Sequence, residues 1–442
     1  METVIGRHEE LALLEGLVER SASGAAALVL EGEVGIGKTT LWRAGVVAAE
    51  QRSLRVLATR PAEAERNLAH AGLGDLFEGA LDELLPSLPA PRRSALEVAL
   101  LLADPEGRPP DARAIGVAVL AGLRTLAEAK PVLIAVDDVQ WLDASSAASL
   151  EFALRRLTDY PTLLLLTRRS GEAGPAPESA LPPEVVTRRK IGPLTLGAIH
   201  QLLLGQLGRA FPRPTLLRIH ETSDGNPFLA LELASALART EAPLRAGEPF
   251  PVPETLEALV GDRLQTLPEE ARSVLVAATV LADPTVEQLA SGWPNAADSL
   301  ETARREEVIT IERGRVRFTH PLLASVLLEQ APPDQRRRLH ARLAELVDDP
   351  IEHARHLALA AERPDPVVAE RLDRAAAAVR ASGALLAAAD LGELAVRATP
   401  DEHTKNHGRA LQAARDLLAA GAADRARSMA EELLARPNAG PV

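Results

Sequence analysis

The sequence contains no cysteine, and it has few aromatic residues and few lysines. Without cysteine the protein can form neither disulfides nor thiolate metal sites, which fits a reducing compartment. Aromatic residues are 2% of the chain, and the lysines are Lys38, Lys130, Lys190 and Lys405. Alanine, leucine and arginine take their place, and all three have high helix propensity. We therefore expect a largely helical protein in which arginine clusters are weak evidence of function.

The sequence also lacks a long apolar run and a surplus of positive charge. No stretch approaches the roughly 18 apolar residues that a membrane-spanning helix requires. The start carries Glu2, Glu9 and Glu10, where a secretory signal would be basic and then apolar. The formal net charge of −13 argues against direct binding of this chain to DNA or to an anionic membrane. We expect a cytoplasmic protein without a membrane partner, built from about three domains.

Positions 32–39 read GEVGIGKT and fit the pattern G-x-x-x-x-G-K-[ST]. The apolar run 26–30 comes directly before, so a strand, a phosphate-binding loop and a helix start are predicted. Glycines let backbone N–H groups turn inward around a polyphosphate, Lys38 reaches the β and γ phosphates, and the Thr39 hydroxyl can bind Mg²⁺. The helix that begins at Lys38 adds its positive dipole end. The candidate nucleotide-binding residues here are Gly32, Gly35, Gly37, Lys38, Thr39 and Thr40.

A second apolar run, Val132–Val136, ends in the paired carboxylates Asp137 and Asp138. Such a short continuous run is typical of a parallel strand that is buried on both faces. Acidic residues at the end of this strand, about 100 residues after a phosphate loop, indicate a nucleotide-hydrolysis motif. We assign Asp137 to Mg²⁺, together with Thr39, and Asp138 to activation of the attacking water. Lys38 completes the expected catalytic set.

An arginine is the next candidate. A further buried strand, predicted at 163–167 (LLLLT), ends at Arg168 and Arg169. An arginine that leaves a strand beside the aspartate-bearing strand could reach the γ phosphate, because its fork of donors matches phosphate oxygens. Arg168 is our first choice, and Arg169 stays open as its alternative. A solvated arginine pair is an equally good interpretation.

The order of predicted elements divides the chain into four domains. Strands alternate with helices up to residue 191, which predicts a parallel sheet with nucleotide at the carboxyl ends of its strands. Helices follow, and then a helical segment with a short hairpin around Arg313 and Gly314. The expected domains are a P-loop nucleotide-binding domain (1–191), a helical lid (192–250), a winged-helix-like domain (251–332) and helical repeats (333–442).

Small residues in the last hundred positions recur at a constant offset of 38 residues. Ala376, Ala381, Gly383, Ala384 and Ala388 recur as Ala414, Ala419, Gly421, Ala422 and Ala426. Small residues at such places let paired helices pack closely, so this segment resembles tetratricopeptide-type hairpins with a lengthened loop. Solenoids need three or more repeats, whereas about two are present. We therefore expect the chain to be part of something longer.

Together these segments resemble a signal-transduction ATPase with numerous domains (STAND), and more narrowly the amino-terminal part of the large ATP-binding regulators of the LuxR family. The matching segments, in the family's order, are 5–7, 31–40, 136–143 (VDDVQWLD), 225–228 (GNPF), 318–322 (FTHPL) and the helical repeats. The resemblance implies an α/β parallel-sheet P-loop (AAA/STAND-like) domain followed by an all-helical lid, a winged helix and tetratricopeptide-like repeats.

The resemblance also implies roles for single residues, with ATP or ADP and Mg²⁺ as cofactors. Arg7 would belong to the Gly-Arg box that clasps the adenine side of the nucleotide, and Pro227 would pack near the adenine. Arg168 would sense the γ phosphate. His320 would stand where the winged helix touches the β phosphate of ADP. Thr319 precedes it, unlike the Met-His-Asp triplet of animal and plant relatives, so a structural histidine is the alternative.

The expected function is a regulatory switch with slow ATP hydrolysis. ADP would lock the three amino-terminal domains together, ATP would release them, and the repeats would sense an inducer or a partner protein. ATP-dependent self-association is a further expectation. DNA binding is expected only through a carboxyl-terminal helix-turn-helix that this chain does not contain. The alternatives are an AAA-type motor or loader, which usually has glutamate where Asp138 stands, and the same module joined to a cyclase or kinase output.

Overall fold

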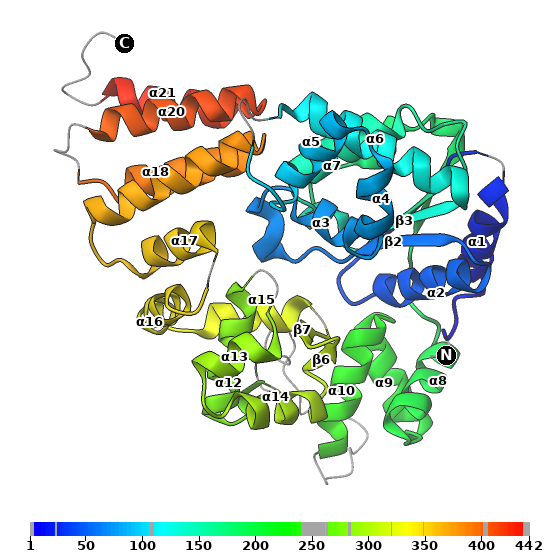
Figure 1. Cartoon of the computed structure of the whole chain (residues 1–442). Coiled ribbons are helices and arrows are strands. Elements are labelled where there is room, and N and C mark those ends of the chain that lie inside the picture. Colours follow the sequence, from blue (N-terminus) through cyan, green and yellow to red (C-terminus); the bar gives the residue numbers. More distant parts are fainter. Residues whose placement is uncertain are drawn as a thin grey trace.

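The computed structural model describes residues 4–22, 24–105, 110–239, 261, 264–281, 284–319, 321–347, 349–400 and 405–435. Four parts surround a common centre: a sheet domain, a three-helix lid, a helical part with a β-hairpin, and a row of helical hairpins (Figure 1). In this view the sheet domain and the last helical hairpins lie in the upper half, and the lid and the part with the β-hairpin lie below them. The expected boundary between lid and winged-helix-like domain, at residues 250 and 251, lies outside the described residues.

Five parallel strands form one sheet in the order β2-β3-β4-β1-β5. The strands are β1 (Ala26–Gly32), β2 (Arg55–Thr59), β3 (Val132–Val136), β4 (Thr162–Arg169) and β5 (Val186–Lys190). This confirms the predicted parallel sheet. The order puts β3 between β2 and β4, so whatever follows these three strands meets at one edge of the sheet.

Helices cover both faces of the sheet. One face carries α1 (His8–Glu19) and α2 (Lys38–Gln51), and the other carries α3 (Ala71–Phe77), α4 (Leu81–Ser87), α5 (Ala90–Ala99), α6 (Ala112–Ala129) and α7 (Ala144–Leu154). In β4, Leu163 and Leu165 belong to the core under α1 and α2, whereas Leu164 and Leu166 belong to the other core. Since alternate residues of a strand point to opposite faces, odd-numbered positions of β4 face α2.

The lid is a three-helix cluster of α8 (Leu196–Leu207), α9 (Arg213–Ser223) and α10 (Pro227–Arg239). Its core contains Ile199, Ile219 and Leu233, which are fully buried. Asn226 caps α10, because its side-chain oxygen accepts hydrogen bonds from the N–H groups of Phe228 and Leu229. The cap places the start of α10 beside the phosphate loop (Figure 1).

The next part combines helices with one antiparallel hairpin. Its elements are α12 (Glu269–Val280), α13 (Val286–Gly292), α14 (Ala296–Arg305), β6 (Ile309–Glu312), β7 (Arg315–Phe318) and α15 (Pro321–Gln330). Arg313 and Gly314 both have positive φ, of 51° and 81°, as the tight turn of a hairpin requires. Two ion pairs join this hairpin to the sheet domain: Arg315 with Glu78 at 3.1 Å, and Arg43 with Glu312 at 3.5 Å.

The remaining helices pack as successive antiparallel hairpins. They are α16 (Pro333–Ala344), α17 (Pro350–Ala360), α18 (Pro366–Ala381), α19 (Leu385–Arg397), α20 (Lys405–Ala419) and α21 (Ala423–Ala435). The turn between α18 and α19 contains Gly383 at φ +83°, and the turn between α20 and α21 contains Gly421 at φ +80°. The N–H of the next residue, Ala384 or Ala422, donates back to the carbonyl of Val379 or Leu417. The offset of 38 residues is therefore matched by two turns of the same geometry.

The first of these turns rests on the sheet domain. His70 Nε2 lies 3.0 Å from the carbonyl oxygen of Ser382, and both side chains are buried. A Cβ atom added at Gly383 would lie 3.2 Å from Ile115 Cδ1 of α6, whereas one added at Gly421 would have nothing within 4 Å. The row of hairpins is thus anchored to the sheet domain at the α18–α19 turn.

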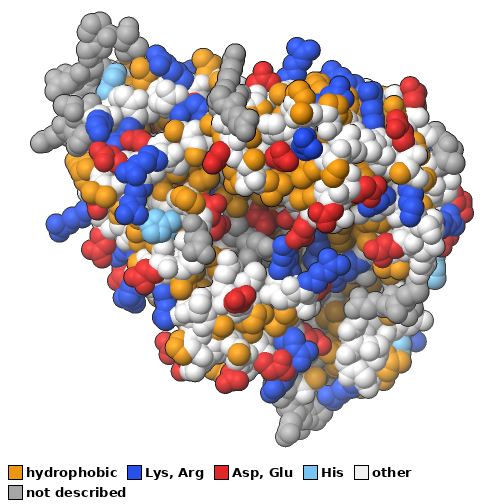
Figure 2. All heavy atoms as spheres, in the orientation of Figure 1, with side chains coloured by type: hydrophobic (Ala, Val, Ile, Leu, Met, Phe, Trp, Pro, Cys, Tyr) orange, Lys and Arg blue, Asp and Glu red, His pale blue; other side chains and the backbone are white. Residues whose placement is uncertain are grey.

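None of the described helices combines the length and the apolar character that a membrane crossing requires. On the face shown in Figure 2, basic and acidic side chains are interspersed, and a recess separates the upper half of the molecule from the two parts below.

Candidate nucleotide-binding site

The phosphate loop connects β1 to α2 at the carboxyl edge of the sheet. Gly35 and Gly37 have φ values of +79° and +100°, which glycine adopts without the steric cost that other residues would meet. Helix α2 begins at Lys38, so its positive dipole end faces the loop. The backbone therefore has the strand, glycine-rich loop and helix that the motif predicts, in an arrangement suited to binding an anion.

Lys38 spans the mouth of this loop. Its Nζ donates hydrogen bonds to the carbonyl oxygens of Gly32 at 3.0 Å and Glu33 at 2.8 Å. The side chain is 6% exposed. Burial lowers the pKa of Lys38, and the negative charge of Asp138 opposes that shift. Thr39 is half-buried and Thr40 is exposed at the start of α2, next to this ammonium group.

Asp137 and Asp138 follow β3, as the sequence predicts, and a threonine on β4 holds both. The Thr167 hydroxyl donates to Asp137 Oδ1 at 2.6 Å and accepts a hydrogen bond from the backbone N–H of Asp138 at 2.7 Å. Asp137 is 3% exposed. Asp138 has a φ of 50°, a left-handed conformation that a short polar residue tolerates better than most. Both residues line the same cavity.

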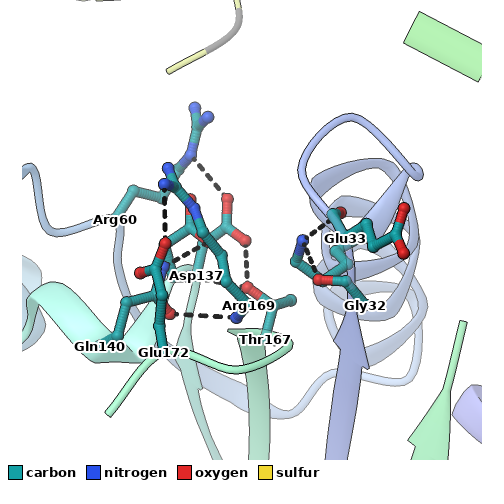
Figure 3. A network of polar contacts seen from close by, with 10 residues as sticks. Gly32, Glu33, Arg60, Asp137, Gln140, Thr167, Arg169 and Glu172 are labelled. Carbon is teal, nitrogen blue, oxygen red and sulfur yellow. Dashed lines mark hydrogen bonds and ion pairs between the residues drawn. The ribbon is translucent and has the colours of Figure 1, made fainter. Parts of the chain in front are cut away.

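Asp138 is held by its neighbours and is only partly neutralised. Gln140 Nε2 donates to Asp138 Oδ1 at 3.0 Å, and Arg169 Nε lies 3.8 Å from the same oxygen (Figure 3). Burial raises the pKa of Asp138, and the adjacent Asp137 raises it further. A carboxyl group with a raised pKa is a better proton acceptor than an exposed one.

Two arginines from the flanking strands face the two carboxylates (Figure 3). Arg60, which follows β2, places its Nε 3.4 Å from Asp137 Oδ2. Arg169, the last residue of β4, approaches Asp138, and its guanidinium stacks 4.1 Å from the centre of the Trp141 ring. The acid pair thus lies between two cationic side chains, and no such partner was predicted for Asp137.

Arg168, the first choice made from the sequence, does not line this cavity. Its Nη2 donates to the carbonyl of Pro175 at 2.7 Å and lies 3.4 Å from the buried carboxylate of Glu178. Position 168 is even-numbered, so its side chain leaves the sheet on the α7 side, whereas Arg169 leaves on the α2 side. The alternative, Arg169, is the one that faces the phosphate loop.

Arg7 lies behind the phosphate loop. Its Nη1 donates to the carbonyl of Gly192 at 2.7 Å, and its Nη2 donates to the carbonyl of Ile36 at 2.8 Å. The side chain is 6% exposed, and burial lowers its pKa. Arg7 therefore ties three segments together: the start of the chain, the loop, and the connection from β5 to the lid.

The lid touches the phosphate loop directly. Asn226 Nδ2 donates to the carbonyl of Val34 at 2.9 Å, and the Phe228 N–H donates to the carbonyl of Gly35 at 3.3 Å. Pro227, between these two residues, lies against Gly37 and faces the cavity. His320 lies outside the described residues. Thr319, one residue earlier, lines the cavity.

One cavity of about 410 Å³ connects these groups. Its walls include the phosphate loop and Thr40, the Asp137–Asp138 pair with Arg60 and Arg169, Arg7, Pro227 of the lid, and Thr310 and Phe318 of the hairpin. Thr39 and Asp137 both face it, and hydroxyl and carboxylate oxygens are donors that suit Mg²⁺. Within the described ranges no three His, Asp or Glu side chains gather into a metal cluster. Mg²⁺ would therefore take its remaining ligands from phosphate and water.

Sequence reasoning missed several residues of this site, notably Arg60 and Thr167. Thr167 could have been found, since it is the single polar residue at the end of a leucine run that pairs with the aspartate-bearing strand. No local signal points to Arg60, because it lies in a segment that reads as an ordinary strand end before Pro61.

A comparison with models of protein families found a match to most of the sheet domain. Residues 3–166 match the family model described as an AAA ATPase domain. An uncharacterized protein of Rhizobium meliloti (strain 1021) is 29% identical over 247 residues, which cover 51% of this chain and 23% of that protein. The chain therefore spans about a quarter of the length of this relative.

Among solved structures, a STAND protein with a tetratricopeptide repeat sensor from Pyrococcus horikoshii is similar along nearly the whole chain. The match has a TM-score of 0.54 at 14% identity and covers 98% of this chain and 64% of that chain. A Walker-type ATPase of Pyrococcus abyssi gives a TM-score of 0.35 at 15% identity, over 73% of this chain and 96% of that one. The fold is thus that of a P-loop AAA/STAND protein with a helical carboxyl-terminal region.

Proposed function

We propose that this protein is a nucleotide-switched regulatory ATPase, on the premise that residues 3–166 form an AAA-type ATPase domain and that the chain has the AAA/STAND fold. The observation that carries the proposal is the cavity, because the sheet domain, the lid and the hairpin of the next part all contribute to its walls. A nucleotide held there would contact all three at once. Its chemical state could then decide whether they stay together.

Contacts at the phosphate loop support this coupling. The carbonyls of three consecutive loop residues, Val34, Gly35 and Ile36, accept hydrogen bonds from Asn226, Phe228 and Arg7. Any shift of the loop on nucleotide binding would therefore displace or break these hydrogen bonds to the lid and to the amino-terminal segment. Converting a mostly closed population to a mostly open one takes about 5.5 kcal/mol of differential binding, which γ-phosphate contacts and an inducer could supply together.

The residues of the site suit hydrolysis of ATP to ADP and phosphate. Bound Mg²⁺, held by Thr39 and Asp137, would neutralise phosphate charge. Lys38 would exchange its two carbonyl partners for β and γ phosphate oxygens. Asp138 would orient a water and accept its proton, and Arg169, in place of Arg168, would contact the γ phosphate. Hydrolysis would be slow, so that the nucleotide state persists long enough to act as a signal.

We infer that the chain is the ATPase core of a LuxR-family transcriptional regulator in the cytoplasm, with the α16–α21 hairpins as the sensor of an inducer or partner. The segments that resemble this family support the inference, as does the larger size of the relative from Rhizobium meliloti. DNA binding would belong to a part of the whole protein outside this chain.

The test is to denature the purified protein and identify any released nucleotide by chromatography. We expect nearly one ADP per chain, because a switch at rest retains its nucleotide. An empty protein that hydrolyses added ATP at many turnovers per minute would contradict the switch and favour an AAA-type motor. Protein that neither retains nor binds nucleotide would contradict both.

Substitution of the two adjacent arginines separates their roles. Arg169→Ala should weaken binding of a non-hydrolysable ATP analogue by about tenfold while ADP affinity changes by less than about threefold, because one charge-assisted hydrogen bond to the γ phosphate is lost. Arg168→Ala should leave both affinities unchanged and lower the melting temperature by a few degrees, since the buried Glu178 loses one of its partners. Titration calorimetry and thermal unfolding measure the two effects. A larger loss of analogue affinity in Arg168→Ala would restore Arg168 as the sensor.

A further inference from the structure

Arg60 occupies an unusual position between two cavities. It follows β2, next to the strand that ends in Asp137, and its side chain lines both the nucleotide cavity and a second cavity of about 160 Å³. The second cavity lies between the sheet domain and the part that carries the hairpin, with Arg317 and Phe318 in its wall. A side chain placed there can respond to events in either part.

The side chain of Arg60 holds the carboxylate assigned to Mg²⁺. Asp137 Oδ1 already accepts a hydrogen bond from Thr167, and Oδ2 is the oxygen that faces Arg60 Nε at 3.4 Å (Figure 3). The Asp137 side chain is 4% exposed and that of Arg60 is 24% exposed, so water screens this pair only in part. The guanidinium of Arg60 is thus the positive counter-charge beside Asp137 Oδ2.

The backbone of Arg60 is held by the hairpin. Arg317 Nη1, on β7, donates a hydrogen bond to the carbonyl oxygen of Arg60 at 3.2 Å. Arg315, two residues before it on the same strand, pairs with Glu78. Strand β7 therefore contacts the sheet domain at two residues, Glu78 and Arg60. Arg60 is also the residue whose side chain faces Asp137.

We propose that Arg60 is a positioning residue that neutralises Asp137 when no metal is bound and links the metal site to the β6–β7 hairpin. This inference rests on the proposed function, since it requires a metal–nucleotide complex at the site. A divalent cation and the guanidinium repel each other at Oδ2, so Arg60 must withdraw for the carboxylate to serve the metal. Because Arg317 holds its carbonyl, Arg60 transmits that withdrawal to the hairpin.

Binding of Mn²⁺ in the presence of saturating ADP tests the first half of the proposal. Free Mn²⁺ is counted by electron paramagnetic resonance, so the readout does not depend on hydrolysis. Arg60→Gln, and Arg60→Ala as a second variant, should bind Mn²⁺ at least about fivefold more tightly than wild type, because a competing cation is gone. Arg60→Lys should stay within about twofold of wild type. Arg66→Gln removes the same charge from an exposed position in the following 3-10 helix (Glu63–Asn67) and should change nothing.

The second half is tested by Arg317→Gln, alone and combined with Arg60→Gln. Alone it should tighten Mn²⁺ binding by about twofold to threefold, because the backbone of Arg60 is no longer fixed over Asp137, and in the Arg60→Gln background this gain should vanish. Unchanged or weaker Mn²⁺ affinity in both Arg60→Gln and Arg60→Ala overturns the proposal. Additive effects of Arg60→Gln and Arg317→Gln overturn the link to the hairpin. If wild type itself binds no Mn²⁺ with ADP, the proposed function fails as well.

Discussion

Lys38→Ala should lower the affinity for ADP by about a hundredfold or more, so that the variant is purified without nucleotide. Lys38 is the single cation within the phosphate loop, and its ammonium group already lies across the loop mouth on the carbonyls of Gly32 and Glu33. On ADP binding, these two neutral acceptors would be replaced by two charged oxygens of the β phosphate, and with ATP one of the two would be a γ oxygen. Charge-assisted hydrogen bonds contribute about 1.5–3 kcal/mol each, so losing two of them costs about 3 kcal/mol or more.

The experiment needs a control for the loss of one positive charge from a strongly acidic chain. Lys190→Ala serves, because Lys190 is exposed at the end of β5, away from the walls of the nucleotide cavity. It should retain wild-type affinity in titration calorimetry. Thermal unfolding without nucleotide should show Lys38→Ala to be folded. Near-normal ADP affinity in a folded Lys38→Ala protein would mean that nucleotide binds elsewhere or not through the loop.

Asp138→Asn should slow ATP hydrolysis by about a hundredfold to ten-thousandfold while leaving ADP affinity within about threefold of wild type. Asparagine keeps the size of the side chain and an oxygen that can accept from Gln140, but it cannot take a proton from water. The effect should therefore appear in the single-turnover rate rather than in binding. Asp137→Asn should differ by raising the Mg²⁺ concentration needed for the half-maximal rate, because a ligand of the metal is lost. Equal single-turnover rates in wild type and Asp138→Asn would exclude Asp138 as the group that activates water.

The single-turnover rate of ATP hydrolysis should also depend on pH. Asp138 must be deprotonated to accept a proton, and both burial and the charge of Asp137 raise its pKa above the ordinary 3.8. Hydrolysis should therefore fall as the pH drops, with a midpoint above that value, and be independent of pH above it. In Asp138→Asn the residual rate should no longer fall as the pH drops through this range. Single-turnover rates measured across acidic and neutral pH, in both proteins, would show it.

The parts of the site that adjoin one another in the chain could be predicted from the sequence. The phosphate loop needs only its own glycines, lysine and threonine, and Asp137 and Asp138 need only the apolar strand before them. The parallel sheet and the hairpin around Arg313 and Gly314 likewise depend on local patterns. The fold predictions among these agree with the structure because each uses short-range geometry.

The choice between Arg168 and Arg169 could not be made in this way. Positions 163–166 are four leucines, buried on both faces of the sheet. The sequence therefore does not tell whether the odd-numbered or the even-numbered side chains of β4 face α2. Only the packing of Leu163 and Leu165 against α1 and α2 decides it. Arg60 was missed for a related reason: its partners are Asp137, 77 positions away, and Arg317, 257 positions away. Such pairings follow from the strand order and from the docking of the hairpin.

The anchoring of the helical hairpins at Ser382 and Gly383 has a mechanical consequence. Because the α18–α19 turn and Ala69 hold the hairpins to the sheet domain while the α20–α21 turn has open space around it, a rotation of the hairpins would have its fulcrum beside residues 69 and 70. Helix α18 has 16 residues and is about 24 Å long, so a rotation of about 10° at the fulcrum moves its far end by about 4 Å. His70 and Asp143 are joined through the His70 N–H, and Asp143 lies five residues after Asp138. A small displacement beside Asp143 would thus become a larger one at Pro366, the start of α18.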